Sequence, residues 1–356
     1  MVSKEGKLVG LIENKHLPPH NGHKFMCEWS LAHLKTRAQR QGKGHHLYVA
    51  VCSRDGEVID GKLRFEWTKK MLADPNVTVL HANNVLSRFP EYGSDYNNHE
   101  MWGRVATEML GLGDQIDYLY ASEDYGPGIA AAAGAEFIPC DKDRSNIPVS
   151  GTEVRESPVE NWEYIPSVVR PFFAKKVCVF GAEYTGKTKL VDHLSRHFDT
   201  VSVPEYAPMI YDNKTRAFTM KDLEEIAEHH LAAEEALLQQ TNKLLLSCTD
   251  ILTTATWAYE SFGRCPAWIE QEAGKKKYDL YLFMDPKGLS HTPGNTHPDR
   301  ESWLRFSDKL MEALESRNRP YQVISGDAQN RTQEARRAIN NMYWNKKDLI
   351  WMPGGK

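Results

Sequence analysis

The stretch at residues 181–188 reads Gly-Ala-Glu-Tyr-Thr-Gly-Lys-Thr, and it lies between an apolar run and a helical pattern. It satisfies G-x-x-x-x-G-K-[ST] at every fixed position, in the strand-loop-helix order that this pattern requires. Glycines let such a loop wrap a polyphosphate, and consecutive N–H groups face the anion. We therefore expect Gly181 and Gly186 to shape an ATP-binding loop, Lys187 to reach the β- and γ-phosphates, and Thr188 to hold Mg²⁺.

Length and composition limit the class of protein further. A chain of 356 residues usually fills more than one core, so two domains are expected. The net charge of −4 and the absence of a long basic block argue against nucleic acid as the main partner. Six scattered cysteines without a C-x-x-C pair are typical of reduced thiols in a cytoplasmic protein. No apolar run approaches ~18 residues, so we expect no membrane span, and the sequence does not exclude a homo-oligomer.

Strand and helix patterns alternate along the chain. This alternation predicts parallel sheets with helices on their faces, with ligands at the carboxyl ends of the strands. The fold class is therefore α/β, with two doubly wound parallel-sheet domains. The predicted strands lie at 7–12, 47–51, 77–80, 118–120 and 135–138 in the first half, and at 177–180, 200–205, 244–250, 278–284 and 321–324 in the second.

The loop after the first strand contains His20-Asn21-Gly22-His23, at the start of a predicted helix. This segment resembles the H-x-G-H signature of nucleotidylyltransferases. In that chemistry a phosphate attacks the α-phosphate of a nucleoside triphosphate, so the enzyme has to position groups and neutralise charge. Imidazoles at a helix N-terminus suit that task, and the resemblance implies that His20 and His23 are catalytic.

A second segment, at residues 149–155, resembles the I-S-x-T-x-x-R segment near the end of such domains. The resemblance implies that Ser150, Thr152 and Arg155 bind the triphosphate together with Lys15, His20 and His23. Three positions depart from the usual G-x-F-x-P-x-H-x-G-H pattern, namely Glu13, Asn14 and His16. Asn tolerates a positive φ better than most residues, so the turn can survive at Asn14. A charged Glu13 could repel the triphosphate.

The segment between the two halves carries three prolines and several aromatic residues, which predict a packed linker rather than a tether. Its order, W-E-Y-I-P-x-x-V-[KR]-P-F-F followed by the phosphate loop, resembles the bifunctional nicotinamide-nucleotide adenylyltransferase/ribosylnicotinamide kinase family of NAD salvage, from about residue 7 to about residue 342. Family members that also repress transcription carry a helix-turn-helix domain before the first strand; this chain opens on that strand, so no DNA-binding role is expected. The implied domains are a Rossmann-like nucleotidylyltransferase at 1–156, the linker at 157–175 and a P-loop nucleoside kinase at 176–356.

The second half supplies candidates for the kinase site. The resemblance places Glu205 and Tyr206 beside the nucleoside, where the Glu205 carboxylate would accept a proton from the attacking ribose hydroxyl. A helical repeat from Leu223 to Leu245 precedes a Walker B pattern that ends at Asp250, the candidate Mg²⁺ ligand. At Cys248 a thiol replaces the first acid of the family's D-T-D.

Two arginines and two tryptophans complete the candidates. Arg300 and Arg305 follow a Gly/Pro-rich loop at 287–298 and are expected to meet the transferred phosphoryl group of ATP. A helix is predicted after them, at 307–315. Trp102 in the first half and Trp257 in the second are candidates for stacking on a cationic nicotinamide ring. Core packing is an equal alternative for both tryptophans.

The predicted function is phosphorylation of ribosylnicotinamide by ATP with Mg²⁺, followed by adenylyl transfer to the nicotinamide mononucleotide, which gives NAD and pyrophosphate. The expected partners are these small molecules alone. Three alternatives stay open: only one competent half, a non-enzymatic sensor of NAD or ATP, and a similar pair of reactions on another nucleoside.

Overall fold

The computed structural model describes residues 6–92, 98–211, 218–290 and 299–344. These residues form two compact units that divide between Val169 and Arg170. Each unit is built around its own parallel sheet of five strands. The α/β class with two doubly wound sheets is therefore confirmed.

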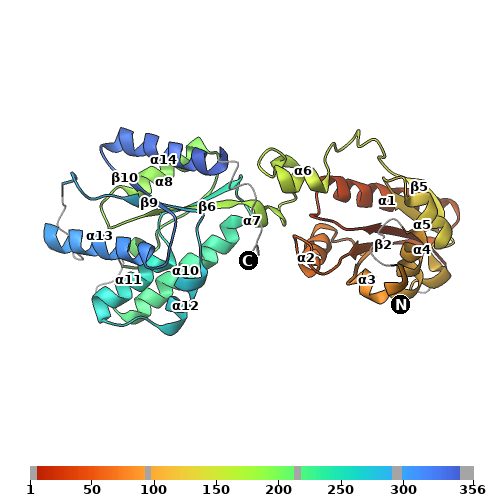
Figure 1. Ribbon diagram of the computed structural model, residues 1–356, viewed down its shortest axis with the longest axis horizontal. Helices are drawn as coiled ribbons and strands as arrows, with labels where there is room; N and C mark the ends of the chain where they lie inside the picture. The colour runs from red at the N-terminus through yellow and green to blue at the C-terminus, as the bar shows by residue number, and fades with distance from the viewer. Residues whose placement is uncertain (1–5, 93–97, 212–217, 291–298, 345–356) are drawn as a thin grey trace. The chain divides into compact units, whose positions relative to one another are not determined.

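The first unit has the strand order β3-β2-β1-β4-β5, with every pair parallel (Figure 1). Its central strand, β1, pairs with β2 on one side and with β4 on the other. The strand order reverses at β1, and the carboxyl end of such a strand is where open α/β sheets bind ligands. The strands are β1 (Lys7–Asn14), β2 (Gly44–Cys52), β3 (Val77–Ala82), β4 (Tyr118–Ala121) and β5 (Glu136–Pro139).

Side chains of β1 alternate between two cores, as the period of a strand requires. Leu8 and Ile12 pack in the core that contains the buried face of α1, and Leu11 packs in the core that contains α4 and α5. The helices are α1 (Asn21–Arg40), α2 (Gly61–Met71), α3 (Val85–Arg88), α4 (His99–Arg104), α5 (Gly126–Ala132) and α6 (Gly151–Glu156). Short turns of 3₁₀ or π-helix lie at Pro90–Tyr92, Val105–Met109, Gly113–Gln115 and Trp162–Tyr164.

The second unit has the order β10-β9-β6-β8-β7, again all parallel. The strands are β6 (Lys175–Phe180), β7 (Ser202–Val203), β8 (Leu244–Ser247), β9 (Leu280–Met284) and β10 (Tyr321–Ile324). Its helices are α7 (Arg170–Phe173), α8 (Lys187–His197), α9 (Ala207–Tyr211), α10 (Met220–Leu238), α11 (Ile251–Phe262), α12 (Ala267–Lys275), α13 (Arg300–Glu315) and α14 (Ala328–Trp344).

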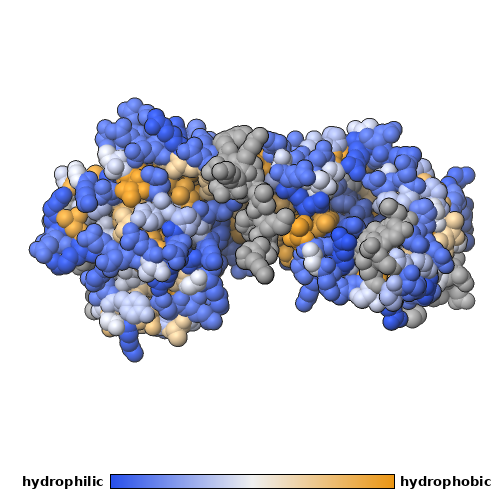
Figure 2. Space-filling view, in the orientation of Figure 1, coloured by the Kyte–Doolittle hydropathy of each residue, from blue (hydrophilic) through white to orange (hydrophobic). Residues whose placement is uncertain are grey.

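The central strand β6 also separates two cores. Val177 and Val179 pack in the core that contains α8 and α14, whereas Cys178 and Phe180 pack in the core that contains α11 and α13. Figure 1 shows α8 and α14 on one side of this sheet and α10 to α13 on the other. The face in view in Figure 2 is mainly hydrophilic, as expected when amphipathic helices turn their apolar stripes to a sheet.

Three element boundaries differ from the sequence prediction. The helix predicted to reach Leu245 ends at Leu238, because the buried run from Leu244 forms β8 between β6 and β7. The strand predicted to reach Glu205 ends at Val203, where Pro204 cannot donate a ladder hydrogen bond. The helix predicted from 307 begins at Arg300, because Asp299 caps it by accepting a hydrogen bond from the N–H of Ser302.

One backbone expectation is also wrong. The left-handed turn before the two histidines is at His16, with φ of 46°, whereas Asn14 completes β1. Part of the loop predicted at 287–298, residues 291–298, lies outside the described residues.

Packing of α4 on α5 gives a test of the first unit. A Cβ added at Gly103 would lie 2.5 Å from the Cβ of Ala132 and 2.9 Å from its carbonyl carbon. We expect Gly103→Ala to lower the free energy of unfolding by about 1–3 kcal/mol through overpacking. The control Gly274→Ala, on α12 with nothing within 4 Å of the new Cβ, should raise it by about 0.5–1 kcal/mol. Denaturant unfolding measures both, and equal stability of the two variants would contradict the packing.

Candidate active sites

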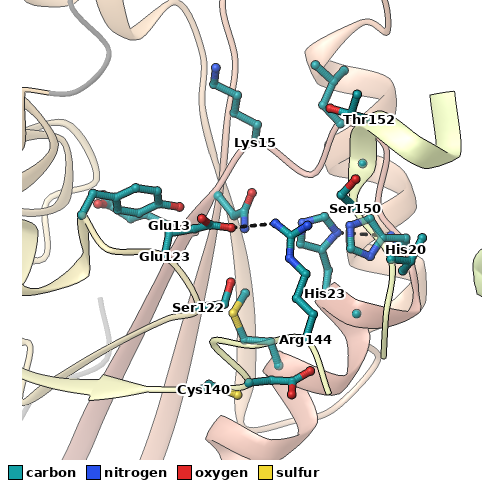
Figure 3. A pocket seen from close by; sticks show the side chains of 18 of the residues that line it. Glu13, Lys15, His20, His23, Ser122, Glu123, Cys140, Arg144, Ser150 and Thr152 are labelled. Atoms are coloured by element: carbon teal, nitrogen blue, oxygen red, sulfur yellow. Dashed lines mark hydrogen bonds and ion pairs between the residues drawn. The ribbon is translucent and has the colours of Figure 1, made fainter. Parts of the chain in front are cut away.

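A cavity of about 440 Å³ lies in the first unit, bordered by the ends of β1 and β2 and by the starts of α1, α4, α5 and α6. Every residue that the sequence proposed for catalysis or binding in this half lines the cavity. These residues come from three segments far apart in the chain, and they are Lys15, His20, His23, Trp102, Ser150, Thr152 and Arg155. Figure 3 shows His20, His23, Ser150 and Thr152 on one side of the cavity and Glu13 and Glu123 on the other.

Three histidine rings pack against one another at and just before the N-terminus of α1, with interplanar angles of 35° and 36°. The ring centroids of His20 and His23 are 3.8 Å apart, and those of His16 and His23 are 4.4 Å apart. His23 Nδ1 accepts a hydrogen bond from the His20 backbone N–H at 3.3 Å, and His16 Nδ1 is 2.9 Å from the Thr68 hydroxyl. His16 was missed as a supporting residue, because only its place before the signature could have indicated it.

Burial keeps these imidazoles neutral. It lowers the pKa of His16 to about 3 and that of His20 to about 4, with smaller contributions from nearby charged groups that include Arg64 and Arg144. Burial also lowers the pKa of His23 well below its usual value, and His20 and His16 add to the shift. Each neutral ring carries one N–H donor, and of the three rings those of His20 and His23 line the cavity.

The hydroxyl segment is organised as a helix start. The Ser150 hydroxyl caps α6 by accepting a hydrogen bond from the Glu153 N–H at 3.2 Å, and the Glu153 carboxylate accepts one from the Ser150 N–H at 2.7 Å. Arg155 donates to the Thr152 hydroxyl at 3.0 Å and to the Leu17 carbonyl. Arg155 thereby ties the loop before the histidines to α6.

Several lining residues were missed because no motif marks them. Arg144 donates to the Glu123 carboxylate at 2.9 Å, and the dashed line in Figure 3 marks this pair. Asp141 orders the loop after β5 by accepting hydrogen bonds from Asn146 and from the Ile147 N–H. The signal that could have found them is position, since charged residues just after β4 and β5 must meet at the carboxyl edge of the sheet.

Glu13 also lines the cavity, at the carboxyl end of β1. Its side chain is buried, with 7% of the residue surface exposed. Burial raises the pKa of this carboxyl to about 8, so it is mostly protonated at neutral pH. The neutral form removes the electrostatic repulsion of a triphosphate that a charged Glu13 would exert.

The phosphate loop of the second unit joins β6 to α8. Gly181 and Gly186 adopt φ of 142° and 90°, a range that favours glycine. Lys187 begins α8 and is 5% exposed. Its Nζ donates to the Ala182 carbonyl at 3.1 Å and lies 3.9 Å from the Glu205 carboxylate, so the structure brings these two predicted residues together.

The predicted metal ligands are arranged differently from the expectation. The Thr188 hydroxyl lies 3.5 Å from the Cys248 thiol. The buried Asp250 carboxylate caps α11 by accepting from the Thr253 N–H at 3.1 Å, and its second oxygen accepts from the Tyr281 hydroxyl at 2.8 Å. Burial raises the pKa of Asp250 to about 6. Both oxygens of Asp250 are therefore engaged within the protein.

The remaining kinase candidates have other contacts. Arg300 donates to the Leu289 carbonyl at 2.7 Å, and the exposed Arg305 pairs with Glu301 at 2.8 Å. The ring of Trp257 packs 4.1 Å from that of Phe306, centroid to centroid. The ring of Tyr206 lies 5.6 Å from that of His229.

Two further residues support the phosphate loop and were missed by sequence reasoning. The Trp303 indole donates to the Glu183 carbonyl at 2.8 Å. The buried Arg331 donates to the Asp285 and Gly326 carbonyls, each at 2.7 Å, and to that of Thr185 at 3.4 Å. All four acceptors are backbone oxygens, so no sequence pattern marks these contacts.

The described residues contain no cluster of three or more His, Cys, Asp or Glu side chains able to hold a metal by themselves. Within the described parts of the chain, no helix is long and apolar enough to cross a membrane.

The chain is similar to known proteins in sequence and in fold. Residues 176–331, which contain the phosphate loop, match the family model described as an AAA domain. Over 88% of its length the chain is 25% identical to the trifunctional NAD biosynthesis/regulator protein NadR of Escherichia coli (strain K12), and it covers 78% of that protein. The corresponding protein of Salmonella typhimurium (strain LT2) is 25% identical over 88% of this chain and 77% of its own length.

Two solved structures share the fold of the whole chain. A NadR protein in complex with NAD and AMP-PNP aligns with a TM-score of 0.70 at 19% identity, and one in complex with NR aligns with 0.69 at 20% identity. Each alignment covers 95% of this chain and 96% of the other. The resemblance predicted from the motifs is confirmed: the chain is a homologue of the NadR proteins.

The buried groups of the first unit predict a stability maximum near pH 6.5. Below that pH the unfolded histidines bind protons that folded His16 and His20 do not, so stability falls as the pH falls toward about 4. Glu13 acts in the opposite direction, because the unfolded residue loses its proton near pH 4.5 whereas the folded residue keeps it up to about pH 8. Above pH 6.5 the stability therefore falls as the pH rises, until about pH 8.

Hydrogen exchange at the β1 amides, corrected for the intrinsic rate, measures this dependence in the first unit alone. We expect Glu13→Gln to abolish the decline between pH 6.5 and 8 and to leave the acid side intact. The same alkaline decline in the variant would show that Glu13 is not the buried acid responsible.

Proposed function

We propose that the chain is a bifunctional enzyme of NAD salvage. The second unit would phosphorylate ribosylnicotinamide with ATP, and the first would join the resulting nicotinamide mononucleotide to AMP from a second ATP. The observation that carries the proposal is the convergence of Lys15, His20, His23, Ser150 and Arg155, from separate segments, on one cavity in a homologue of NAD biosynthesis proteins.

In the first unit the chemistry is an in-line displacement at phosphorus. A phosphate oxygen of the mononucleotide would form a bond to the α-phosphorus of ATP as the bond to the bridging oxygen of pyrophosphate breaks. His20 and His23 would donate N–H groups to the phosphate oxygens, while Lys15 and Arg155 would neutralise the charge that develops on pyrophosphate. Ser150 and Thr152 would orient the triphosphate, and Trp102 would stack on the nicotinamide ring.

In the second unit Lys187 would leave the Ala182 carbonyl and bind the β- and γ-phosphates of ATP, supported by the backbone around Gly181 and Gly186. Glu205, already beside Lys187, would accept the proton of the attacking ribose hydroxyl. Mg²⁺ bound to the ATP phosphates would neutralise their charge, and Thr188 is the protein group that fits it best.

The other assignments concern groups that already have partners in the protein. Asp250 keeps lone-pair capacity beside its hydrogen bonds from Thr253 and Tyr281, with which it would bind a metal-bound water. Arg300 and Arg305 keep N–H donors beside those given to Leu289 and Glu301, with which they would meet a phosphoryl group. Tyr206 and Trp257 are proposed to line the nucleoside site. We place the enzyme in the cytoplasm, with ATP, ribosylnicotinamide, nicotinamide mononucleotide and NAD as its ligands.

One observation favours an alternative with a single competent half. Cys248 puts a thiol, rather than a carboxylate, 3.5 Å from the Thr188 hydroxyl. A thiol is a poor ligand for Mg²⁺, which prefers oxygen. In this alternative the first unit catalyses adenylyl transfer, and the second binds ATP with little turnover.

The kinase assignment predicts that Lys187→Ala lowers kcat for ribosylnicotinamide phosphorylation by on the order of 100-fold or more, because a cation on the transferring phosphates is lost. The matched control is Lys189→Ala, which removes an exposed lysine two residues along the same helix and should leave the rate unchanged. Equal rates in the wild type and the Lys187 variant would contradict the assignment.

The adenylyltransferase assignment predicts that His23→Ala lowers NAD formation from nicotinamide mononucleotide and ATP by about 100- to 1,000-fold, the usual cost of one aimed donor. His45→Ala, at a partly exposed position on β2 outside the cavity, is the control. Kinase activity should be retained in both variants. NAD formation that survives His23→Ala would overturn the role of this histidine.

A further inference from the structure

Glu13 is the buried polar group of the cavity that the proposed chemistry does not use. It is the residue before Asn14, the last residue of β1, and it lies opposite Ala50 of β2 in the sheet register. Neither carboxyl oxygen has a hydrogen-bond partner among the residues that the structure describes, and 7% of the residue is exposed. An unsatisfied buried carboxyl costs stability, so its presence in a ligand cavity points to a partner supplied by the ligand.

The two arginines that line the cavity do not satisfy this carboxyl. Arg144 donates to Glu123, and Arg155 donates to Thr152 and to the Leu17 carbonyl. Figure 3 places Glu13 on the side of the cavity away from His20, Ser150 and Thr152, which are the proposed phosphate-binding groups. One side of the cavity therefore carries proposed phosphate-binding groups. The other side carries a buried acid whose oxygens have no hydrogen-bond partner among the described residues.

The surroundings of Glu13 suit a flat ring. Trp102, Tyr125 and Ile129 line the same cavity, and all three contribute to the apolar core beneath it. Tyr125 and Cys52 line the same cavity as Glu13, and burial is the main cause that raises the pKa of the Tyr125 hydroxyl and of the Cys52 thiol. A ring with one amide substituent would rest its apolar surface on these side chains and turn the substituent to Glu13.

We propose that Glu13 is a specificity-determining residue that recognises the carboxamide of nicotinamide mononucleotide and disfavours the carboxylate of nicotinate mononucleotide. This inference rests on the proposed adenylyl transfer in the first unit. A carboxylic acid presents one O–H donor and one C=O acceptor on a single edge, and a primary carboxamide presents the complementary acceptor and N–H donor. Two parallel hydrogen bonds result.

The carboxylate of the nicotinate analogue fits this edge poorly. It offers two acceptors, so one of its oxygens would face the Glu13 carbonyl oxygen. It would also bring a negative charge into a buried site where Arg144 is already paired with Glu123. A site built to hydrogen-bond one group rejects an analogue that leaves its buried polar atoms unpaired.

The adenine of ATP carries a similar donor and acceptor edge, so the experiment has to separate the two ligands. We would measure kcat/KM for adenylyl transfer to nicotinamide mononucleotide and to nicotinate mononucleotide, and the KM for ATP, in the wild type, Glu13→Leu and Glu13→Gln. Leu keeps an apolar side chain of similar size without hydrogen bonds, and Gln keeps a donor and an acceptor without a charge.

We expect Glu13→Leu to lower kcat/KM for nicotinamide mononucleotide roughly 10- to 100-fold, as for the loss of one or two buried hydrogen bonds. The value for nicotinate mononucleotide should fall much less, so the preference between them collapses, and Glu13→Gln should restore most of it. The KM for ATP should not change. Equal losses for both mononucleotides, or a raised KM for ATP alone, would overturn the inference.

Controls separate this inference from the proposed function and from misfolding. Glu136→Gln removes an exposed carboxylate that pairs with Arg37 in the same unit, outside the cavity, and should keep the wild-type preference. Glu13→Leu should unfold no earlier than the wild type, because it removes an unsatisfied buried group. If the wild type forms no dinucleotide from either mononucleotide, the proposed function fails; a wild type that turns over both equally refutes the role of Glu13 alone.

Discussion

The binding of a polyphosphate at the carboxyl end of a central parallel strand is the constraint on which both units depend. In a parallel sheet the loop after each strand and the start of the following helix meet at one edge, where backbone N–H groups are free to face an anion. β1 leads into α1 through His20 and His23, and β6 leads into α8 through Gly186 and Lys187. The strand order reverses at both central strands, which opens room for the ligand.

The two units meet this constraint with different chemistry. The second unit holds the Lys187 ammonium 3.9 Å from the Glu205 carboxylate, so its loop between β6 and α8 is polar before any ligand binds. The first unit buries three imidazoles and an unpartnered carboxyl, and burial keeps all four largely neutral at pH 7. Neutral side chains cost less free energy to bury than charged ones. The negative charge of a bound triphosphate would then favour protonation of the imidazoles.

Much of this could be predicted from the sequence, because the decisive signals are local. The period of two in β1 and β6, the glycines at Gly181 and Gly186, and the paired histidines are readable within short windows. The fold class and the motif residues that line the first cavity followed from such windows, whereas Glu123, Asp141 and Arg144 did not. The assignments that remain proposals in the second unit concern side chains such as Arg300, whose partner is set by a neighbouring loop.

What could not be predicted depends on contacts between distant segments. The pair of Arg144 with Glu123 joins two loops without a motif, and the engagement of Asp250 depends on Tyr281 from another strand. The end of α10 at Leu238 reflects the insertion of β8 into the sheet, which outweighed a continuing apolar repeat. The neutral state of Glu13 could not be predicted either, because it depends on the burial of the side chain, which the sequence alone does not provide.

The central claim is that two reactions occur in sequence on one chain. The most direct test follows labelled ribosylnicotinamide through incubation of the wild-type chain with ATP and Mg²⁺. The account predicts that labelled nicotinamide mononucleotide appears first and that labelled NAD then accumulates, with one pyrophosphate released for each NAD. A chain that neither phosphorylates the nucleoside nor converts added nicotinamide mononucleotide to NAD would contradict it.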